Sequence, residues 1–305
     1  MTSTLLRRHL YFLLFVLGSF LIFWKPLGRL IAFSSTHDYG SHVILIAPIS
    51  AYLIYIGRRN VFAKVRADYL TGFSLLLPAA FLGAVTHFYS RTPDDSLSVE
   101  IAALVVLWIA GFALCYGTHA LRAACFPLLF LMLMIPIPDL LIEKVIFSLQ
   151  TGSAGVSYGL FKILNVPVFK EGFVFILPTI NIEIAKECSG IRSSVALLIT
   201  TLLAGDFVLR SAWRKSLLVL SAVPILILKN GLRIVTLSLL SIYVDPRFLD
   251  GWLHTSGGIV FYSLALLSVF PIILLLKRGE VESIGPVGGQ VEHQLAETGR
   301  RLQTP

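Results

Sequence analysis

Three polar segments interrupt long apolar stretches of this chain, and their side chains suit nucleophilic chemistry. The segments are Glu-Cys-Ser-Gly-Ile-Arg at 187–192, Lys-Asn-Gly-Leu-Arg at 229–233, and His254 alone. Ionisable groups in apolar surroundings are costly, so each segment prompts a functional hypothesis. We therefore take Cys188, Arg233 and His254 as the candidate catalytic residues.

These three side chains form a coherent set for acyl transfer. A cysteine is nucleophilic as its thiolate, and a helix N-terminus with a nearby cation lowers the thiol pKa from its free value of about 8.5. Cys188 has this setting, and His254 can take the thiol proton and return it to a leaving amine. Arg233 can stabilise a tetrahedral oxyanion or hold a substrate chain in place.

A second group of residues flanks these candidates: Glu187, Ser189, Arg192, Asn230 and His42. We expect a helix from Ser189 to Leu209, which puts Arg192 one turn after Cys188, on the same face at i+4. His42 could share a metal ion with His37, but no third ligand accompanies them at metal-ligand spacing. We predict neither a metal nor a cofactor.

The composition is that of a membrane protein. Of 305 residues, 56% are apolar and 14% are charged, and the mean hydropathy is +0.83. Soluble domains carry roughly 25% charged residues. The net charge of +8 comes from short basic clusters between apolar runs rather than from one basic face, so we expect no nucleic-acid partner.

Apolar runs near the ~20 residues needed to cross a bilayer predict an all-α, polytopic protein with about eight transmembrane helices. The proposed spans are Leu10–Phe33, Tyr39–Ile56, Tyr69–Tyr89, Val99–Tyr116, Ala123–Ile137, Ser189–Leu209, Leu217–Tyr243 and Thr255–Leu276. Residues 1–276 would form one membrane-embedded domain, and the polar, Gly-rich residues 277–305 a disordered cytoplasmic tail.

Loop charge predicts the orientation, because cytoplasmic loops hold the Lys and Arg excess. With the N-terminus inside, twelve basic residues fall on the inner side: Arg7, Arg8, Arg58, Arg59, Lys64, Arg66, Arg122, Arg210, Arg214, Lys215, Lys277 and Arg278. Four fall in short outer loops: Lys25, Arg29, Arg91 and Arg247. Both termini are therefore expected in the cytoplasm.

The outer loop at 138–187 is the longest. Residues 139–164 have helical apolar spacing and could lie along the membrane interface. Residues 166–170 and 173–177 then read as strands around a turn at Glu171-Gly172, followed by alternating isoleucines at 180–184. We predict a small outer β-hairpin leading directly to Cys188.

The predicted topology brings the three candidate residues together at the outer face. Arg233 precedes the expected end of its helix, Tyr243, by ten residues, or roughly 15 Å of helix. Cys188 and His254 would each begin a helix that runs inward from that surface. All three could line one cleft that opens outward.

Some of these polar residues also fit other interpretations. A cysteine in an apolar helix is usually a small buried hydrophobe, which is how we interpret Cys115 and Cys125. Lys229, Arg192 and Arg233 could instead line the anion pathway of a transporter, although neither inverted repeats nor paired broken helices are visible. The sequence also lacks HExxH and Walker motifs, and the GxSxG match at 155–159 falls within the run of helical spacing at 139–164 rather than at a strand-to-helix elbow.

The order of the motifs resembles the exosortase/archaeosortase family. The resemblance rests on Glu-Cys-Ser-Gly-Ile-Arg-Ser at 187–193, Asn230-x-x-Arg233 and His254-x-x-x-Gly258. Tyr-Gly-Ser-His at 39–42, Pro48, Arg58-Arg59 and Ile-Pro-Ile-Pro at 135–138 extend it over nearly all of the membrane region.

This resemblance implies a Cys-Arg-His enzyme of the cytoplasmic membrane with its active site facing outward. Its substrates would be exported proteins with a PEP-CTERM-like tail, which comprises a Pro-Glu-Pro-like motif, a transmembrane helix and a basic segment. Cys188 would be the nucleophile, His254 the acid/base and Arg233 the oxyanion or substrate-positioning residue. The acyl-enzyme would pass to an unknown acceptor, or to water in a purely hydrolytic thiol peptidase.

Overall fold

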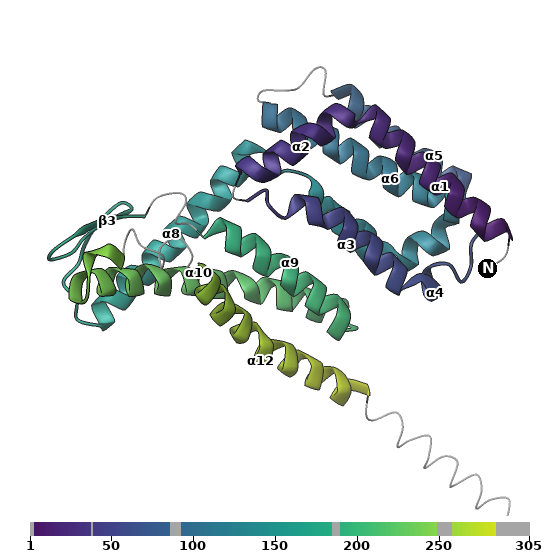
Figure 1. Ribbon diagram of the computed structural model, residues 1–305. Helices are drawn as coiled ribbons and strands as arrows, with labels where there is room; N and C mark the ends of the chain where they lie inside the picture. Colours follow the sequence, from purple (N-terminus) through teal and green to yellow (C-terminus); the bar gives the residue numbers. More distant parts are fainter. Residues whose placement is uncertain (1–2, 38, 86–92, 185–189, 249–257, 285–305) are drawn as a thin grey trace, which may run out of the picture. The chain divides into compact units, whose positions relative to one another are not determined.

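The computed structural model describes residues 3–37, 39–85, 93–184, 190–248 and 258–284 (Figure 1). These residues form helices and one small sheet. The chain divides into two compact units, Met1–Val145 and Ile146–Pro305.

Helices are the only regular elements among the described residues of unit 1. Its elements are α1 (Ser3–Ile22), α2 (Trp24–Thr36), α3 (Val43–Ile56), α4 (Arg58–Val61), α5 (Tyr69–Val85), α6 (Pro93–Ala123), α7 (Cys125–Phe130) and η1 (Leu131–Met134). Helix α8 (Asp139–Ile163) begins in unit 1 and continues into unit 2.

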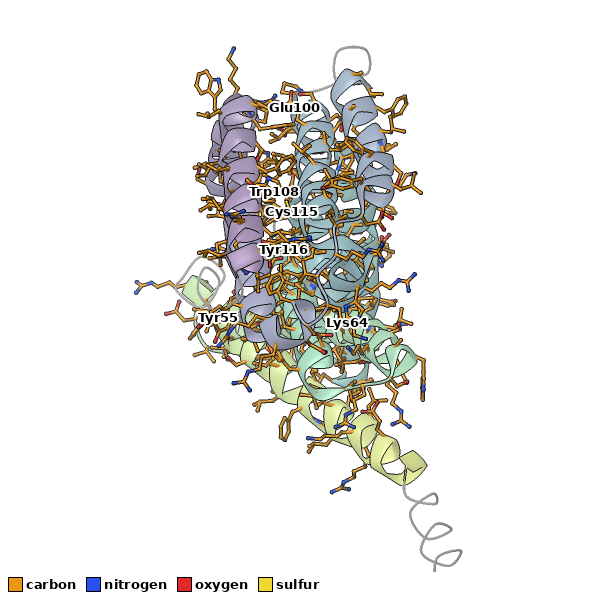
Figure 2. All side chains as sticks on the ribbon, turned by 90° about the vertical axis from the view of Figure 1, so that its right-hand side faces the viewer. Tyr55, Lys64, Glu100, Trp108, Cys115 and Tyr116 are labelled. Atoms are coloured by element: carbon orange, nitrogen blue, oxygen red, sulfur yellow. The ribbon has the colours of Figure 1, made fainter. Side chains whose placement is uncertain are left out.

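Helix α6 is the core of unit 1, and α1 packs antiparallel to it. The Arg8 guanidinium donates to the carbonyl oxygen of Cys115 at 2.8 Å, and the Trp108 indole donates to Ser19 Oγ at 2.8 Å. Figure 2 shows Glu100, Trp108, Cys115 and Tyr116 in order along α6. These bonds satisfy polar groups that would otherwise be costly within apolar surroundings.

Glycine allows two close approaches to α6. A Cβ on Gly72 of α5 would lie 2.2 Å from Leu114 Cδ2, so α5 can pack tightly only with glycine there. Gly117 has φ 84°, and a Cβ there would lie 1.7 Å from the Arg66 carbonyl oxygen. Helix α6 therefore bends at Gly117 around the loop that precedes α5.

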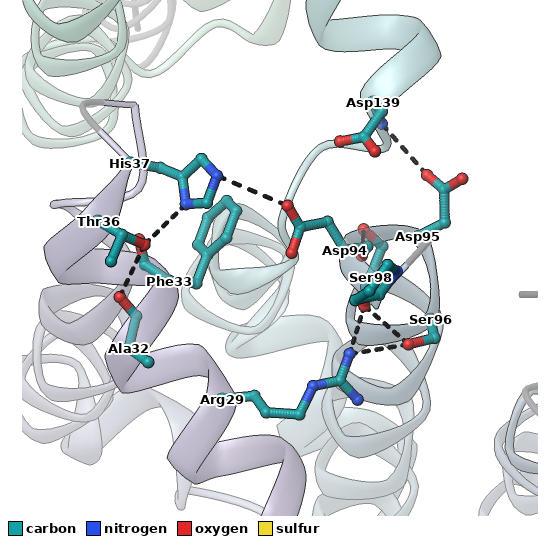
Figure 3. A network of polar contacts seen from close by, with 11 residues as sticks. Arg29, Ala32, Phe33, Thr36, His37, Asp94, Asp95, Ser96, Ser98 and Asp139 are labelled. Atoms are coloured by element: carbon teal, nitrogen blue, oxygen red, sulfur yellow. Dashed lines mark hydrogen bonds and ion pairs between the residues drawn. The ribbon is translucent and has the colours of Figure 1, made fainter. Parts of the chain in front are cut away.

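A polar network ties the end of α2 to the first turn of α6 (Figure 3). Arg29 donates to Glu100 Oε2 at 3.0 Å and to Ser96 Oγ at 2.8 Å. His37 Nε2 lies 3.6 Å from Asp94 Oδ2, and the backbone amide of Asp139 donates to an oxygen of Asp95 at 3.2 Å. The start of α8 is thereby attached to α6.

Unit 2 contains the rest of α8, a three-stranded sheet and three long helices. Its further elements are β1 (Phe169–Glu171), β2 (Val174–Ile176), β3 (Asn181–Glu183), α9 (Ile191–Val208), α10 (Ala212–Tyr243), η3 (Pro246–Phe248) and α12 (Gly258–Ile284).

The sheet is antiparallel in the order β1-β2-β3, with Phe175 opposite both Lys170 and Ile182. Gly172 has φ 58° in the first turn, where a glycine is needed. The sheet is anchored to the helices because Phe175 packs with Phe161 of α8 and Ile234 of α10. The predicted hairpin is confirmed, and the alternating isoleucines supply its third strand.

The helices confirm a multi-pass membrane protein, but not the count of eight spans. Five described helices are long and apolar enough to cross a bilayer: Thr4–Ile22, Pro93–Ala123, Ile191–Val208, Ala212–Tyr243 and Gly258–Glu280. A sixth is possible if Cys125–Met134 and Asp139–Ile163, which meet at 92°, form one broken span. Val43–Ile56 and Tyr69–Val85 are shorter apolar helices.

Several boundaries differ from those expected. The first predicted span is divided at Phe23 into α1 and α2. Helix α10 starts at Ala212 rather than Leu217. Helix α12 continues to Ile284, past the expected start of the tail at Lys277, because the Glu280 carboxylate accepts the backbone amides of Arg210 and Ser211. Residues 285–305 lie outside the described residues.

Candidate active site

The structure describes part of the predicted site. Asn230 and Arg233 lie on α10, and Arg192 lies in the first turn of α9. Four predicted site residues lie outside the described residues: Cys188, His254, Glu187 and Ser189. The site can therefore be built from the described segments on either side of them.

Helix α9 begins later than expected, which corrects the expected helical spacing between Cys188 and Arg192. Its first residue is Ile191, and the preceding Gly190 adopts a left-handed conformation, with φ 75° and ψ 18°. The i+4 relation between Cys188 and Arg192 requires both residues in one helix, so it does not apply. Arg192 is exposed.

Gly190 is held between α9 and α10. Its carbonyl oxygen accepts hydrogen bonds from Ser193 Oγ at 3.0 Å and from Ser194 Oγ at 2.9 Å. A Cβ at Gly190 would lie 3.0 Å from Asn230 Oδ1 and 3.5 Å from Lys229 Nζ. The left-handed backbone angle therefore favours glycine, and a side chain at this position would also have to displace the Asn230 amide slightly.

Lys229 completes this contact. Its side chain is only 5% exposed, and its ammonium group donates to Ser193 Oγ. Because Ser193 in turn donates to the Gly190 carbonyl, a continuous hydrogen-bonded path joins α10 to the residue that follows Ser189. We call Gly190, Ser193, Lys229 and Asn230 the glycine latch.

Helix α8 supports the glycine latch from another side. Asn230 Nδ2 donates to Ser153 Oγ at 3.0 Å, and Ser157 Oγ bonds to the carbonyl oxygen of Gly231 at 3.3 Å. A Cβ on Gly231 would lie 2.5 Å from Val156 Cγ1. Glycine at this position lets α8 and α10 come close enough for these bonds to form.

Helix α8 also fixes the end of the sheet. Gln150, which is 7% exposed, donates through Nε2 to the carbonyl oxygen of Ile184. The amide of Ile184 donates to the carbonyl oxygen of Phe173 at 3.0 Å. The segment that contains Cys188 is thus anchored at Ile184 before it and at Gly190 after it.

Helices α9 and α12 begin at the same end of unit 2. Thr200 Oγ1, at the middle of α9, lies 2.9 Å from Tyr262 Oη in the second turn of α12, and Glu280, near the end of α12, accepts the Arg210 and Ser211 amides just beyond the end of α9. Helix α10 runs antiparallel to α9, because Lys215 pairs with Asp206 at 2.6 Å while Lys229 reaches Ser193. Arg233 is half-buried, ten residues before the last residue of α10, Tyr243.

Other predicted polar residues lie in unit 1. His42 precedes α3, and its Nε2 lies 3.2 Å from the carbonyl oxygen of Leu133. His37 contacts Asp94 and Thr36. Cys115 is half-buried, whereas Cys125 is exposed, which contradicts its interpretation as a buried residue. An exposed side chain in a membrane helix contacts lipid at no hydrophobic cost.

Comparison with known proteins adds a family to this geometry. The model of the transmembrane exosortases matches residues 33–271, which include the glycine latch and all three candidate catalytic positions. The chain belongs to the transmembrane exosortase family. Membership indicates a membrane enzyme that processes sorting signals. No curated protein and no solved structure matches the chain.

Sequence reasoning missed the supporting residues on α8. Gln150, Ser153 and Ser157 are all buried, at 7%, 1% and 0% exposure. Their spacing of three and four residues puts them on one helix face, and a polar face on an otherwise apolar exosortase helix could have indicated a polar partner. Lys229 was visible within its motif, but its contact with Ser193 depends on the packing of α9 against α10.

Proposed function

We propose that this exosortase is a cysteine-dependent peptidase or transpeptidase that cleaves C-terminal sorting signals of exported proteins at the outer face of the cytoplasmic membrane. Its substrates carry a PEP-CTERM-like motif, a transmembrane helix and a basic tail. Cys188 is the nucleophile, His254 is the acid/base, and Arg233 stabilises the oxyanion or positions the substrate.

The reaction proceeds through a thioester. His254 takes the Cys188 proton, and the thiolate attacks the carbonyl carbon of the scissile peptide bond to give a tetrahedral oxyanion. The C–N bond then breaks, and His254 gives its proton to the leaving amine. An acceptor amine, or water, attacks the thioester, breaks the C–S bond and returns the thiol.

The glycine latch is the observation that carries this proposal. Cys188 is two residues from Gly190, so covalent geometry alone limits their Cα–Cα distance to about 7.6 Å. The latch attaches Gly190 to the face of α10 that carries Asn230 and Lys229, one helical turn before Arg233. Fixed positive charge near a cysteine favours its thiolate, and Lys229 and Arg233 supply two cations.

Helix order supports the assignment of His254. It precedes α12 by four residues, as Cys188 precedes α9 by three. Since α9 and α12 begin at the same end of unit 2, both side chains are expected at that end. A general base must come within hydrogen-bond reach of its nucleophile, which this arrangement permits.

The first test is co-expression of a tagged protein bearing a native tripartite tail with the wild-type exosortase or with Cys188→Ala. The wild type should shorten the substrate on a gel, and Cys188→Ala should leave it full length. Cys115→Ala and Cys125→Ala are matched controls that should retain processing. Equal shortening by Cys188→Ala and the wild type would remove Cys188 from the mechanism.

Two further measurements define the chemistry. Arg233→Lys keeps the charge but loses the planar donor fork, and should slow processing by about 100-fold. Mass spectrometry of the shortened product should find an acceptor on the new C-terminus if the enzyme is a transpeptidase. A free carboxylate there would assign the hydrolytic alternative.

A further inference from the structure

Unit 1 contains a groove that the proposed reaction does not use. It has a volume of about 670 Å³ and is lined by residues of α1, α3, α4 and α6, with Phe62 after α4. Aromatic and aliphatic side chains, among them Phe12, Ile54 and Phe112, make up most of its wall. Figure 2 shows Tyr55 and Tyr116, two of its lining residues, toward the same end of unit 1.

Two arginines stand at this groove. Arg58 and Arg59 are both exposed and both line it. Arg58 lies 4.2 Å from the centre of the Tyr55 ring and donates to the Tyr55 carbonyl oxygen at 2.9 Å, so its guanidinium is held in place. Among the described residues, Arg59 has no hydrogen-bond or ion-pair partner.

The groove also has one polar point within its apolar wall. His9 Nδ1 and the Tyr116 hydroxyl lie 2.8 Å apart, and the His9 ring contacts Phe62 edge-on at 4.9 Å. Tyr116 is only 2% exposed. The groove therefore combines a cationic end with an apolar wall that contains one polar pair.

We propose that this groove binds an anionic glycerophospholipid of the surrounding bilayer. Arg58 and Arg59 bind its phosphate, because guanidinium groups recognise phosphate through paired N–H donors. An acyl chain lies against Phe12, Ile54 and Phe112. Basic pockets between transmembrane helices on the cytoplasmic side are suited to anionic headgroups, and loop charge predicts that side for both arginines.

Charge selects this occupant over others. Two exposed cations repel the basic end of a substrate tail, so the groove does not suit that segment. A hydrocarbon-facing apolar groove is filled by acyl chains at no hydrophobic cost, whereas a soluble phosphate would leave the apolar wall empty. The lipid is the ligand that satisfies both parts of the groove.

The binding test uses the full-length chain purified in mild detergent. Native mass spectrometry should detect one phosphatidylglycerol per wild-type chain at concentrations where phosphatidylcholine does not bind. Arg58→Gln/Arg59→Gln should weaken phosphatidylglycerol binding by about 25-fold, since each basic residue contributes roughly one kcal/mol near an anionic headgroup. Lys64→Gln/Arg122→Gln removes the same charge away from the groove and should bind like the wild type.

A second variant tests the apolar part independently. Ala51 lines the groove on α3, so Ala51→Trp should fill it and abolish lipid binding with both arginines intact. Ala80→Trp, on the exposed surface of α5, is the matched control. The proposal would be overturned if both lipids bound equally well, or if the two charge variants lost phosphatidylglycerol binding to the same extent. It would also be overturned if glycerol 3-phosphate competed at lipid-like affinity, or if a second copy of the chain occupied the groove.

Discussion

Gly190 connects backbone conformation to the candidate chemistry. Its φ of 75° occurs immediately before the first residue of α9, and its lack of a side chain leaves room for Asn230 and Lys229. An L-residue in this conformation costs about 1–2 kcal/mol. The backbone conformation therefore favours glycine, and any larger residue would also press against the Asn230 side chain.

Gly190→Ala should lower both stability and processing. We expect a loss of about 1–2 kcal/mol in the free energy of unfolding from the backbone alone, and displacement of Asn230. Gly155→Ala on α8 is the control, because a Cβ at that position would have no neighbour within 4 Å. This substitution should stabilise the helix by roughly 0.5–1 kcal/mol. Thermal unfolding in detergent would measure both, and equal effects of the two substitutions would contradict this role for Gly190.

Lys229 is a buried cation whose contribution to stability and to activity can be separated. Burial of a charged group costs desolvation energy, and the partner of Lys229 is a neutral hydroxyl, so an uncharged side chain of similar volume avoids that cost. Lys229→Met should therefore leave the unfolding midpoint unchanged or raised, yet slow substrate processing by about tenfold or more if its charge favours the Cys188 thiolate. A parallel fall in stability and activity would instead assign Lys229 a purely structural role.

At the scale of elements, the face of α8 that meets α10 organises unit 2. It carries Gln150, Ser153 and Ser157, which bond respectively to the end of the sheet, to Asn230 and to Gly231. A purely apolar helix could pack against α10, but hydrophobic contacts are non-directional and would not fix the register between the two helices. The hydrogen bonds from this polar face of α8 fix the level at which the Asn230-x-x-Arg233 motif of α10 packs against α8.

Gly231→Ala should disrupt this helix pair, because the new methyl group would overlap Val156. Overpacking of this kind typically costs about 1–3 kcal/mol. Val156→Ala in the same chain should restore much of the loss, and a double-mutant cycle would measure the coupling between the two positions. Additive effects of the two substitutions would show that the α8–α10 distance does not depend on this contact.

At the scale of the whole molecule, topology determines where any active site opens. Twelve basic residues on the predicted inner side against four in short outer loops favour cytoplasmic termini. The β-sheet would then lie on the outer side, with the candidate catalytic end of unit 2.

Reporter fusions test this orientation. Alkaline phosphatase inserted after Gly172, in the turn between β1 and β2, should be active because it folds only outside the cytoplasm. The same enzyme fused to the C-terminus should be inactive, and a green fluorescent protein there should fluoresce. The reverse pattern would put the candidate catalytic end of unit 2 in the cytoplasm and exclude the proposed encounter with exported substrates.

The protein class, several secondary-structure elements and the family could be predicted from the sequence. Composition identified a membrane protein, since few charges and repeated apolar runs are sufficient for that conclusion. Strand alternation around Glu171-Gly172 predicted the hairpin, and helical spacing predicted α8 as residues 139–164, one residue longer than observed. The order of the Cys, Asn-x-x-Arg and His motifs led to the family. The strands, α8 and each single motif can be recognised within a short window, whereas composition and the order of the motifs are read along the chain.

Tertiary structure decided the rest, because the deciding contacts join residues distant in sequence. The break at Phe23, the start of α9 at Ile191 and the extension of α12 to Ile284 cannot be read from apolar length alone. The glycine latch depends on α9 meeting α10, and its support depends on a polar face of α8. Hydropathy shows that a segment prefers a membrane, whereas the neighbour of each polar group depends on how the helices pack.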